Sequence, residues 1–335
     1  MGISSISERN MREMIQAFPE LLRTVKIDDR IIERAERESE KGLKGVCFLG
    51  MGGSSIAGEY VRSLLSETSP VPLISVRDYS IPRHVDKDWV VIAVSYSGNT
   101  EETLSAYREA RKRSCTIFSV TTGGELKRVS DTSYVQLIPS GLQPRAALPM
   151  LLSVTLNLTQ SFLGLDHTDF NEVSRQVALS KKEWVGNLMS PETLASKLND
   201  SVPVFFAHGH LAPVAYRAKC QINENAKYTA LSWEIPEANH NEIEASASYK
   251  RFSFLPIFLE SHFENKRMDQ RFSATRAILS SANGLVLKIG SRDRLEEMLS
   301  LTLYLDTVSL ELADLNGVDS LSVDKISELK ARLGG

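Results

Sequence analysis

The sequence is poor in cysteine and in net charge. It has only three cysteines, Cys47, Cys115 and Cys220, and no Cys-x-x-Cys pair. An odd number at such spacing argues against a disulfide framework or a cysteine zinc site, and predicts buried free thiols in a reducing compartment. The net charge of −3 gives no electrostatic reason to expect binding to nucleic acid or to an anionic membrane.

Long hydrophobic runs are also missing from the sequence. Neither an apolar run of membrane-spanning length nor a signal-peptide pattern stands out. We therefore expect a soluble, cytoplasmic protein with no nucleic acid and no membrane among its partners. The 335 residues suit two domains, at about 150 residues each.

The stretch 90–103 carries the first positive signal. Its apolar, β-branched start, 90–94, predicts a strand buried on both faces of a parallel sheet. A helical pattern opens near Asn99, and Asn99 with Glu102 predicts a capping box. Hydroxyl side chains surround a glycine in the turn between strand and helix: Ser95, Ser97 and Thr100. Such a turn at a helix N-terminus suits an anion, although Ser and Asn are also common at any helix start.

A second turn of this kind follows the predicted strand 44–49. The sequence Gly-Met-Gly-Gly-Ser-Ser leads into a helical pattern, and the residues closest to a ligand would be Gly52, Gly53 and Ser54. A dinucleotide fingerprint would need a third glycine where Ser55 stands, and a Walker loop would need a lysine at Glu59. Two turns that are rich in hydroxyls and free of lysine indicate a phosphate monoester held by neutral donors.

The first half alternates strands and helices after an N-terminal helical pattern. The predicted strands are 44–49, 72–76, 89–95, 115–121 and 134–138, and the predicted helices are 54–66 and 99–112, with a short helical piece at 125–130. This alternation predicts a doubly wound parallel sheet with ligands at the carboxyl ends of its strands. Arg145 opens a predicted helix that runs to Leu163. It can face the same crevice, or it can be a surface arginine.

The second half repeats this plan more weakly after a polar helical stretch. We predict strands at 202–207, 229–233, 251–258 and 284–289, a helix over 215–227 and a long helix from Arg292. The fold class is therefore α/β, with two doubly wound, mostly parallel sheets flanked by helices. Four parts follow in order: 1–40 as an N-terminal helical segment, 41–165 as the first domain, 166–200 as a linker and 201–335 as the second domain.

Groups that can transfer protons are concentrated in two motifs of the second half. Glu224 lies in Asn-Glu-Asn-Ala-Lys at the end of a predicted helix; it can act as a base at pH 7, or it can be a helix-surface glutamate. His240 lies in a loop dense in Glu and Asn, and histidine titrates near neutrality. His208 and His210 have His-x-His spacing without a further ligand at a recognised offset, so we expect no metal.

Five motifs stand in order along the chain: GMGGSS, SYSGNTEET, PRAALP, NENAK and EANHNEIE. With them, roughly from residue 44 to 335, the sequence resembles the archaeal-type bifunctional phosphoglucose/phosphomannose isomerases, which carry two sugar-isomerase (SIS) domains and belong to the phosphoglucose isomerase superfamily. The resemblance implies a metal-independent aldose–ketose isomerase without cofactor. It would interconvert glucose 6-phosphate, and also mannose 6-phosphate, with fructose 6-phosphate through an enediolate, in glycolysis and gluconeogenesis.

The resemblance also implies a role for each candidate residue. The phosphate would lie on the two turns, at Gly52, Gly53, Ser54, Ser95, Ser97 and Thr100. Arg145 would stabilise the enediolate charge, and Glu224 would move the proton between C1 and C2. His240 would open the sugar ring and come from the partner subunit of a homodimer. Lys330, in the segment ISELK, would also reach the site.

One position departs from the family pattern. The family has a threonine seven residues before the C-terminal lysine, thought to help the substrate turn about C2–C3, and Val323 stands there with Ser322 adjacent. This departure bears on the mannose 6-phosphate activity and not on the glucose 6-phosphate activity.

Two other classes of protein remain as alternatives. A non-catalytic SIS module that senses a sugar phosphate would need the hydroxyl turns but not Glu224, Arg145 and His240 together. Such a sensor usually carries a DNA-binding or kinase domain, which the sequence does not show. A dehydrogenase is disfavoured by the missing glycine.

Overall fold

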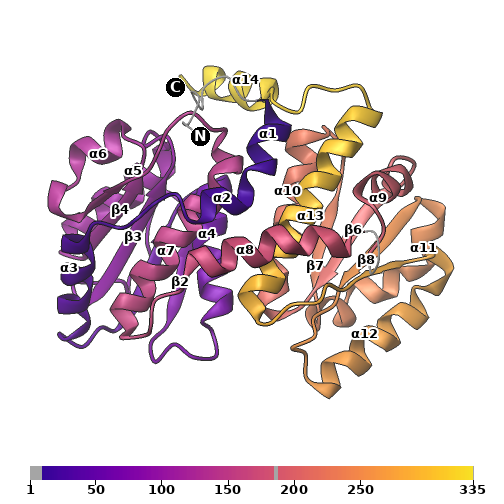
Figure 1. The fold of residues 1–335 in the computed structure, drawn as a ribbon, viewed down its shortest axis with the longest axis horizontal. Helices are drawn as coiled ribbons and strands as arrows, with labels where there is room; N and C mark the ends of the chain where they lie inside the picture. Colours follow the sequence, from indigo (N-terminus) through magenta and orange to yellow (C-terminus); the bar gives the residue numbers. More distant parts are fainter. Residues whose placement is uncertain (1–9, 185–187, 335) are drawn as a thin grey trace. The chain divides into compact units, whose positions relative to one another are not determined.

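The computed structural model describes residues 10–184 and 188–334, and its backbone forms two compact α/β units (Figure 1). The first unit comprises Gln16–Ala178, and the second comprises Leu179–Gly335 with Asn10–Ile15. The division falls inside helix α8 (Phe170–Ser180). Parts of the predicted N-terminal segment, residues 1–9, and of the predicted linker, residues 185–187, lie outside the described residues.

The first unit is built on a sheet of parallel strands in the order β2-β1-β3-β4-β5. The strands are β1 (Gly45–Leu49), β2 (Leu73–Val76), β3 (Trp89–Ser95), β4 (Thr116–Thr121) and β5 (Val135–Leu137). Every residue of β1 and β3 is buried, as the continuous apolar runs predicted. The two central strands pair in register, with Val46 opposite Val90 and Leu49 opposite Ala93.

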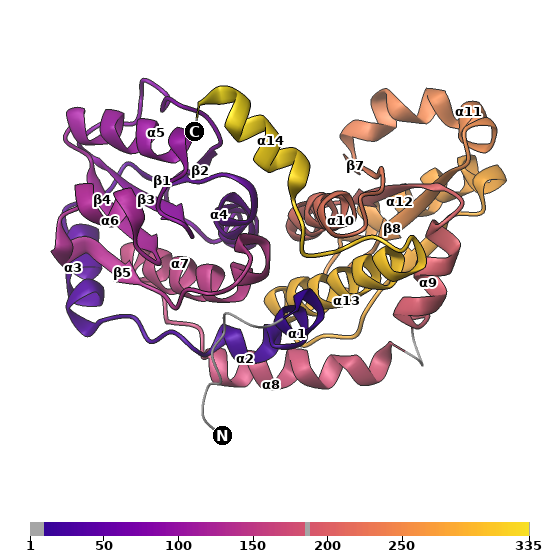
Figure 2. The same cartoon turned by 90° about the horizontal axis from the view of Figure 1, so that it is seen from above.

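Helices cover both faces of this sheet. They are α2 (Phe18–Leu22), α3 (Asp29–Ser39), α4 (Gly52–Leu64), α5 (Glu101–Lys112), α6 (Gly124–Val129) and α7 (Leu148–Leu163), with the 3-10 turns η2 (Thr132–Tyr134) and η3 (Pro144–Ala147). Helices α2, α3 and α4 pack against α7 (Figure 2). Leu104 and Tyr107 of α5 and Leu126 of α6 pack with Cys47 and Leu49 of β1 in a core on the sheet.

The segment Pro144–Leu163, which contains α7, is long and apolar enough to cross a membrane by length and composition alone. Its 18-residue window has a mean hydropathy of 1.3, so one such window exists although none stood out in the sequence. In the structure 83% of this window is buried. A core helix of a globular domain has the same property, because it is covered on all sides.

The second unit contains a shorter parallel sheet in the order β7-β6-β8-β9. Its strands are β6 (Val202–Ala207), β7 (Leu231–Glu234), β8 (Phe254–Leu259) and β9 (Leu285–Leu287). Its helices are α1 (Met11–Gln16), α9 (Pro191–Leu198), α10 (Ala212–Asn225), α11 (Ser246–Arg251), α12 (Lys266–Ile278), α13 (Arg294–Leu315) and α14 (Asp324–Leu333).

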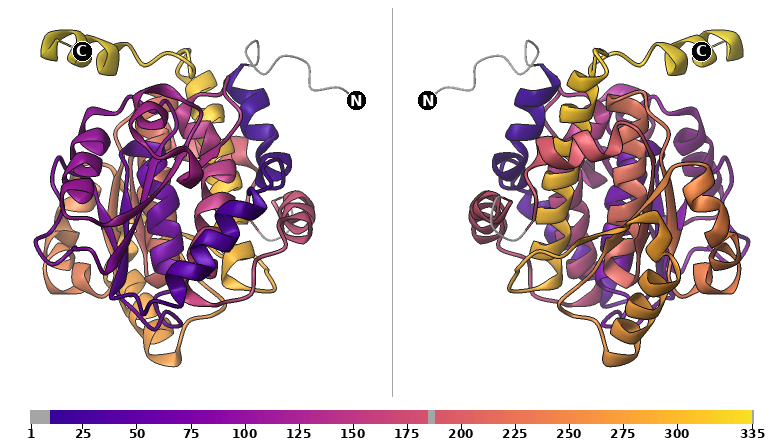
Figure 3. Two further views of the ribbon diagram at one scale, coloured as in Figure 1. Left: turned by 90° about the vertical axis from the view of Figure 1, so that its left-hand side faces the viewer. Right: turned by 90° about the vertical axis from the view of Figure 1, so that its right-hand side faces the viewer.

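Helix α13 forms the centre of the helical layer of this unit and packs against α9 and α10 (Figure 2). Phe206, Phe258 and Phe272 form a core on the other face with α12. Between α10 and α13 lies a buried ion pair, in which Arg217 bonds both carboxylate oxygens of Asp306 at 3.1 and 2.6 Å. Helix α14 follows α13 after a connecting segment and projects from it (Figure 3).

Corresponding turns of the two units share a backbone conformation. Met51 before Gly52 has φ −125° and ψ 153°, and His208 before Gly209 has φ −135° and ψ 153°. The two glycines then have φ +52° and +54°. This match agrees with the weaker repeat of the first half's strand–turn–helix plan that the sequence predicts for the second half.

The predicted capping box at the start of α5 is wrong. The helix begins at Glu101 with Thr100 as N-cap, and no side chain caps it. Asn99 instead accepts a hydrogen bond from the backbone N of Glu125 at 2.9 Å, because α6 packs beside this turn. Asn99 thus bonds Glu125, which is distant in sequence, in place of the predicted pairing with Glu102.

Candidate active site

The two hydroxyl turns lie side by side at the carboxyl edge of the first sheet. Strands β1 and β3 are neighbours, and the chain leaves them in opposite directions, to β2 and to β4, so the turns flank the topological switch point of the sheet. Ligands of open α/β sheets bind at such a point. The Ser54 hydroxyl accepts a hydrogen bond from the backbone N of Tyr96 at 3.2 Å, which joins the first turn to the second.

The second turn is held together by its own hydroxyls. Ser95 Oγ lies 3.0 Å from Thr100 Oγ1 and accepts from the backbone N of Gly98 at 3.1 Å. Ser97 is exposed, and its hydroxyl accepts from the backbone N of Asn99 at 3.2 Å. The N-termini of α4 and α5 add free N–H groups and a partial positive charge at the same edge. The arrangement is therefore a candidate anion site made of uncharged donors.

Two glycines are required because other backbone segments approach them closely. A Cβ on Gly53 would lie 2.9 Å from the carbonyl O of Pro144 and 3.1 Å from Cα of Arg145. A Cβ on Gly98, which has φ +71°, would collide with the carbonyl O of Gly123. The first contact brings the turn η3 against the glycine-serine turn.

Arg145 consequently lies beside the anion site. It belongs to η3, just before α7, and is only 4% exposed, so it is not a surface arginine. Its Nη1 donates to Gln143 Oε1 at 3.4 Å. Tyr96 fixes the same loop, because its hydroxyl donates to Pro139 O and accepts from Leu142 N. The structure thus brings the phosphate-turn candidates and Arg145 together in one unit.

Glu224 lines a pocket of about 670 Å³ in the second unit. Its other lining residues come from the end of α10 and the start of α14: Asn223, Lys227, Tyr228, Thr229, Ser322, Val323, Asp324, Lys325 and Ile326. The volume falls in the range of small-molecule sites, about 300–1,000 Å³. Val323, at the position where the family has threonine, therefore shares this pocket with the candidate base, whereas Lys330 is exposed on α14 and is not among the lining residues.

His240 lies at the carboxyl ends of the strands of the second sheet, whereas Glu224 lies near their amino ends. It follows β7 in the turn η6 (Glu237–His240), and Ile235 N bonds Ala207 O at the carboxyl end of β6. Helix α10 runs back toward the amino edge, where the Tyr228 hydroxyl bonds Asn199 O just before β6. Since α10 rises about 1.5 Å per residue, nearly the whole helix separates the two side chains. The structure does not bring Glu224 and His240 of one unit together.

The His240 turn is fixed on both sides although His240 itself is exposed. Asn239 Nδ2 donates to Thr275 Oγ1 of α12 at 2.8 Å. The Tyr249 hydroxyl donates to Glu242 Oε1 at 2.8 Å, and burial together with this bond raises the pKa of Tyr249. His240 is thus presented to solvent by a rigid loop.

The switch point of the second sheet is occupied by the protein's own side chains. Glu297, fully buried on α13, accepts hydrogen bonds from the backbone N of His262 at 3.0 Å and from the Ser261 hydroxyl at 2.6 Å. His210 Nε2 lies 2.7 Å from the same carboxylate. Over the described ranges, no group of three or more His, Cys, Asp or Glu side chains is arranged to hold a metal ion.

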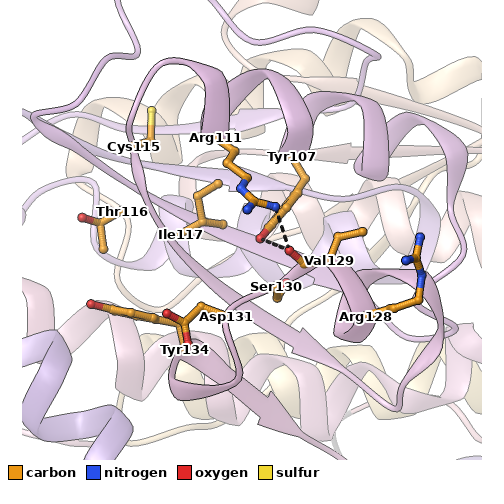
Figure 4. A pocket seen from close by; sticks show the side chains of 10 residues that line it. All are labelled: Tyr107, Arg111, Cys115, Thr116, Ile117, Arg128, Val129, Ser130, Asp131 and Tyr134. Carbon is orange, nitrogen blue, oxygen red and sulfur yellow. Dashed lines mark hydrogen bonds between the residues drawn. The ribbon is translucent and has the colours of Figure 1, made fainter.

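A hollow of about 730 Å³ in the first unit lies around the amino end of β4 (Figure 4), whereas the hydroxyl turns follow the carboxyl ends of β1 and β3. Tyr107 and Arg111 both donate to the carbonyl O of Val129 at 3.2 Å. The other arginine of the lining, Arg128, pairs with Glu125. Because both arginines already have partners and helix carboxyl ends face the space, it is a poorer anion receptor than the switch point.

None of the cysteines lies in the hydroxyl turns or among the lining residues of the Glu224 pocket, although Cys115 lines the hollow of Figure 4. Cys47 and Cys115 are buried, Cys220 is partly buried, and all three are free thiols, as predicted. Burial raises the pKa of Cys47 to about 12 and that of Cys115 to about 11. Both thiols are therefore protonated and unreactive at neutral pH.

The sequence prediction missed Lys227. Its ammonium donates to the carbonyl oxygens of Glu224 at 2.7 Å, Asp319 at 2.7 Å and Ser322 at 2.9 Å. The lysine stands in the motif that singled out Glu224, but nothing local in the sequence indicates contacts with residues more than ninety positions away.

Two doubly wound units, the first with hydroxyl-rich turns at its switch point, are the architecture of a protein with two SIS domains. Residues 44–160 match the SIS domain family, and residues 189–333 match the family described as the bacterial phospho-glucose isomerase C-terminal SIS domain. The chain belongs to the family of bifunctional phosphoglucose/phosphomannose isomerases.

Curated relatives show this membership. The chain is 34% identical to the bifunctional phosphoglucose/phosphomannose isomerase of Caldicellulosiruptor bescii, over 97% of both chains. It is 33% identical to the protein of that name from Aquifex aeolicus, over 87% of this chain and 90% of the relative. It is also 31% identical to the D-glucosamine-6-phosphate 4-epimerase of Sulfolobus acidocaldarius, over 75% of this chain and 81% of the relative.

Solved structures agree on the fold. The tagatose-6-phosphate ketose/aldose isomerase of Escherichia coli matches with a TM-score of 0.73 and 16% identity, over 96% of this chain and 98% of that chain. The C-terminal domain of glucosamine-fructose-6-phosphate aminotransferase from Francisella tularensis matches with a TM-score of 0.70 and 16% identity, over 96% of this chain and 100% of that chain.

Proposed function

We propose that the protein is an aldose–ketose isomerase that interconverts glucose 6-phosphate, and also mannose 6-phosphate, with fructose 6-phosphate, in glycolysis and gluconeogenesis in the cytoplasm. The observation that carries the proposal is the Glu224 pocket, because a sensor of sugar phosphates would need the anion site but no carboxylate at a pocket wall. Family membership supports the same reaction.

The chemistry follows from the residue types. Glu224 removes the proton from C2 of the open-chain aldose, the C–H electron pair forms a C1–C2 double bond, and the carbonyl electrons move onto O1 to give an enediolate. Glu224 then returns the proton to C1 as O2 becomes the ketone oxygen and the O2 proton passes to O1. Arg145 keeps its charge at any working pH and offers fixed donors to this oxygen. Such a donor is worth about 3 kcal/mol in the transition state. The hydroxyl turns bind the phosphate and orient the sugar. Lys330 is proposed to reach the site when substrate is bound.

The test is an assay of EDTA-treated protein with glucose 6-phosphate and mannose 6-phosphate supplied separately, measuring fructose 6-phosphate. Both sugars should turn over, with mannose 6-phosphate the slower because Val323 offers no hydroxyl. A protein that binds these compounds without turnover would be a sensor. Glucosamine 6-phosphate is included, since conversion of that compound alone would move the proposal to the epimerase chemistry of the Sulfolobus acidocaldarius relative.

Ser97→Ala should raise KM about tenfold and leave kcat within about twofold, because a hydrogen bond to a charged phosphate is worth about 1.5–3 kcal/mol and is remote from the reacting carbons. Steady-state kinetics with fructose 6-phosphate measure both constants. Ser66→Ala, just after the carboxyl end of α4 and exposed like Ser97, is the matched control and should change neither. A lower kcat at unchanged KM would remove Ser97 from phosphate binding.

We further propose a homodimer in which each subunit supplies His240 to the partner's site. The opposite positions of Glu224 and His240 on one sheet support this, because one copy of the second unit cannot join them. His240→Ala should lose about 10²–10⁴-fold in rate, with a larger loss on cyclic than on open-chain sugar. Equal losses on both forms would rule out ring opening as its role.

The contribution of His240 by the partner subunit is tested separately. Glu224→Gln and His240→Ala, each nearly inactive alone, should recover roughly a quarter of the wild-type activity when they are unfolded, mixed and refolded together. Half of the dimers formed are then mixed, and each mixed dimer has one intact site. The unmixed variants treated identically are the controls, and no recovery would mean that both residues act in the same subunit.

A further inference from the structure

The connecting segment between α13 and α14 is tied to the end of α10 through one side chain. Lys227 has three N–H donors, and its ammonium contacts the carbonyl oxygens of Glu224, Asp319 and Ser322 at 2.7, 2.7 and 2.9 Å. One of these oxygens belongs to the candidate base, and the other two belong to the segment that leads into Val323. The contact therefore spans the two walls of the Glu224 pocket.

The backbone of Lys227 is shaped for this contact. It is the second residue after α10, and its φ of +55° lies in the left-handed region, which is unfavourable for a lysine. In this conformation the chain folds back, so Tyr228 N bonds Ile222 O at 3.3 Å and the ammonium reaches the last turn of α10. A cation there also interacts favourably with the negative end of the helix.

The other wall of the pocket depends on such an anchor. Helix α14 begins at Asp324, and its residues Ile326, Leu329 and Leu333 are 42%, 57% and 70% exposed, so little of its surface is packed. Val318 N bonds Ala313 O and Leu321 N bonds Asp319 Oδ1, which are both local contacts. The Lys227 ammonium instead connects this segment to a well-packed helix.

We propose that Lys227 is a positioning residue that holds the segment Asp319–Ser322 against the end of α10 and so fixes the Glu224 carboxylate relative to Ser322 and Val323. The inference rests on the proposed role of Glu224 as base. Lys227 takes no part in proton transfer, because its three N–H donors are engaged by the backbone carbonyls of Glu224, Asp319 and Ser322. It sets the width of the pocket.

Lys227→Met keeps the length of the side chain and removes the three bonds. We expect kcat to fall about 10- to 100-fold, as for a displacement of about 1 Å at the reacting atoms, while KM changes less than about threefold because the phosphate turns are untouched. Lys227→Arg should recover part of kcat. Lys250→Met, on the exposed surface of α11, is the matched control and should behave as wild type.

Hydrogen exchange gives a readout that is independent of activity. In Lys227→Met the amides of residues 319–323 should exchange faster, and those of β1 and β3 should exchange at the wild-type rate. Wild-type kcat in Lys227→Met, or unchanged exchange over 319–323, would overturn the inference. A wild-type protein without isomerase activity, or an active Glu224→Gln variant, would instead contradict the proposed function. In that case the exchange over 319–323 would still test whether Lys227 anchors this segment.

Discussion

Glu224→Gln is expected to lose nearly all turnover, at least about 10³-fold in kcat, while the affinity for fructose 6-phosphate stays within about threefold. Glutamine has the shape of glutamate but cannot accept a proton at neutral pH. The pocket at the end of α10 should therefore form normally around it. Binding is measured by calorimetry, and proton abstraction by the exchange of the C2 hydrogen of glucose 6-phosphate with deuterated solvent.

The exchange measurement separates this role from others. Loss of isomerisation with continued exchange at C2 would place Glu224 after proton abstraction, and appreciable retained kcat would remove it from the base role. Glu36→Gln is the matched control, since Glu36 is exposed on α3 of the other unit. It should show wild-type kinetics.

Asp306→Ala should give the largest loss of stability, about 3–5 kcal/mol in the free energy of unfolding of the second unit. Arg217 and Asp306 are 3% and 1% exposed, so removing the carboxylate leaves a guanidinium buried without its charge partner. Arg217 lies two helical turns before Glu224 on α10, so the pair also anchors the helix that carries the candidate base. Urea unfolding followed by circular dichroism measures the change.

An exposed ion pair of the same unit provides the control. Glu328→Ala breaks the contact with Arg332 on α14, where the side chains are 44% and 75% exposed, and should cost less than about 1 kcal/mol. The double variant Arg217→Met with Asp306→Leu should recover much of the loss, because no buried charge is left. Similar losses of stability in Asp306→Ala and Glu328→Ala would contradict the distinction between buried and exposed ion pairs.

The features that the sequence predicted well depend on neighbouring residues. The runs before Gly50 and Ser95 predict buried strands, and the turns after them predict helix N-termini, because each signal lies within a dozen residues. Which strands are neighbours depends on the particular doubly wound order, and the order β2-β1-β3-β4-β5 makes β1 and β3 adjacent. The two turns of the candidate anion site could therefore be predicted from the sequence, whereas their adjacency comes from the structure.

The features that it missed depend on packing between distant segments. Asn99 caps nothing locally because α6 offers the backbone N of Glu125. The burial of Arg145 depends on η3 packing against Gly53, and the contacts of Lys227 depend on where the chain returns after α13. Strand β8 begins at Phe254 instead of residue 251, because α11 extends through Arg251. No periodicity in the sequence contains such information.

The buried Glu297 carboxylate makes the switch point of the second unit different from that of the first. In the second unit the Ser261 hydroxyl and the backbone N of His262 already donate to the Glu297 side chain supplied by α13, and His210 Nε2 lies 2.7 Å from it. Groups that can bind a ligand in the first unit correspond to groups that hydrogen-bond the protein's own Glu297 in the second unit. These donors of the second unit are therefore not open to a phosphate, and we expect a titration with sugar phosphate to saturate at a stoichiometry set by the first unit alone.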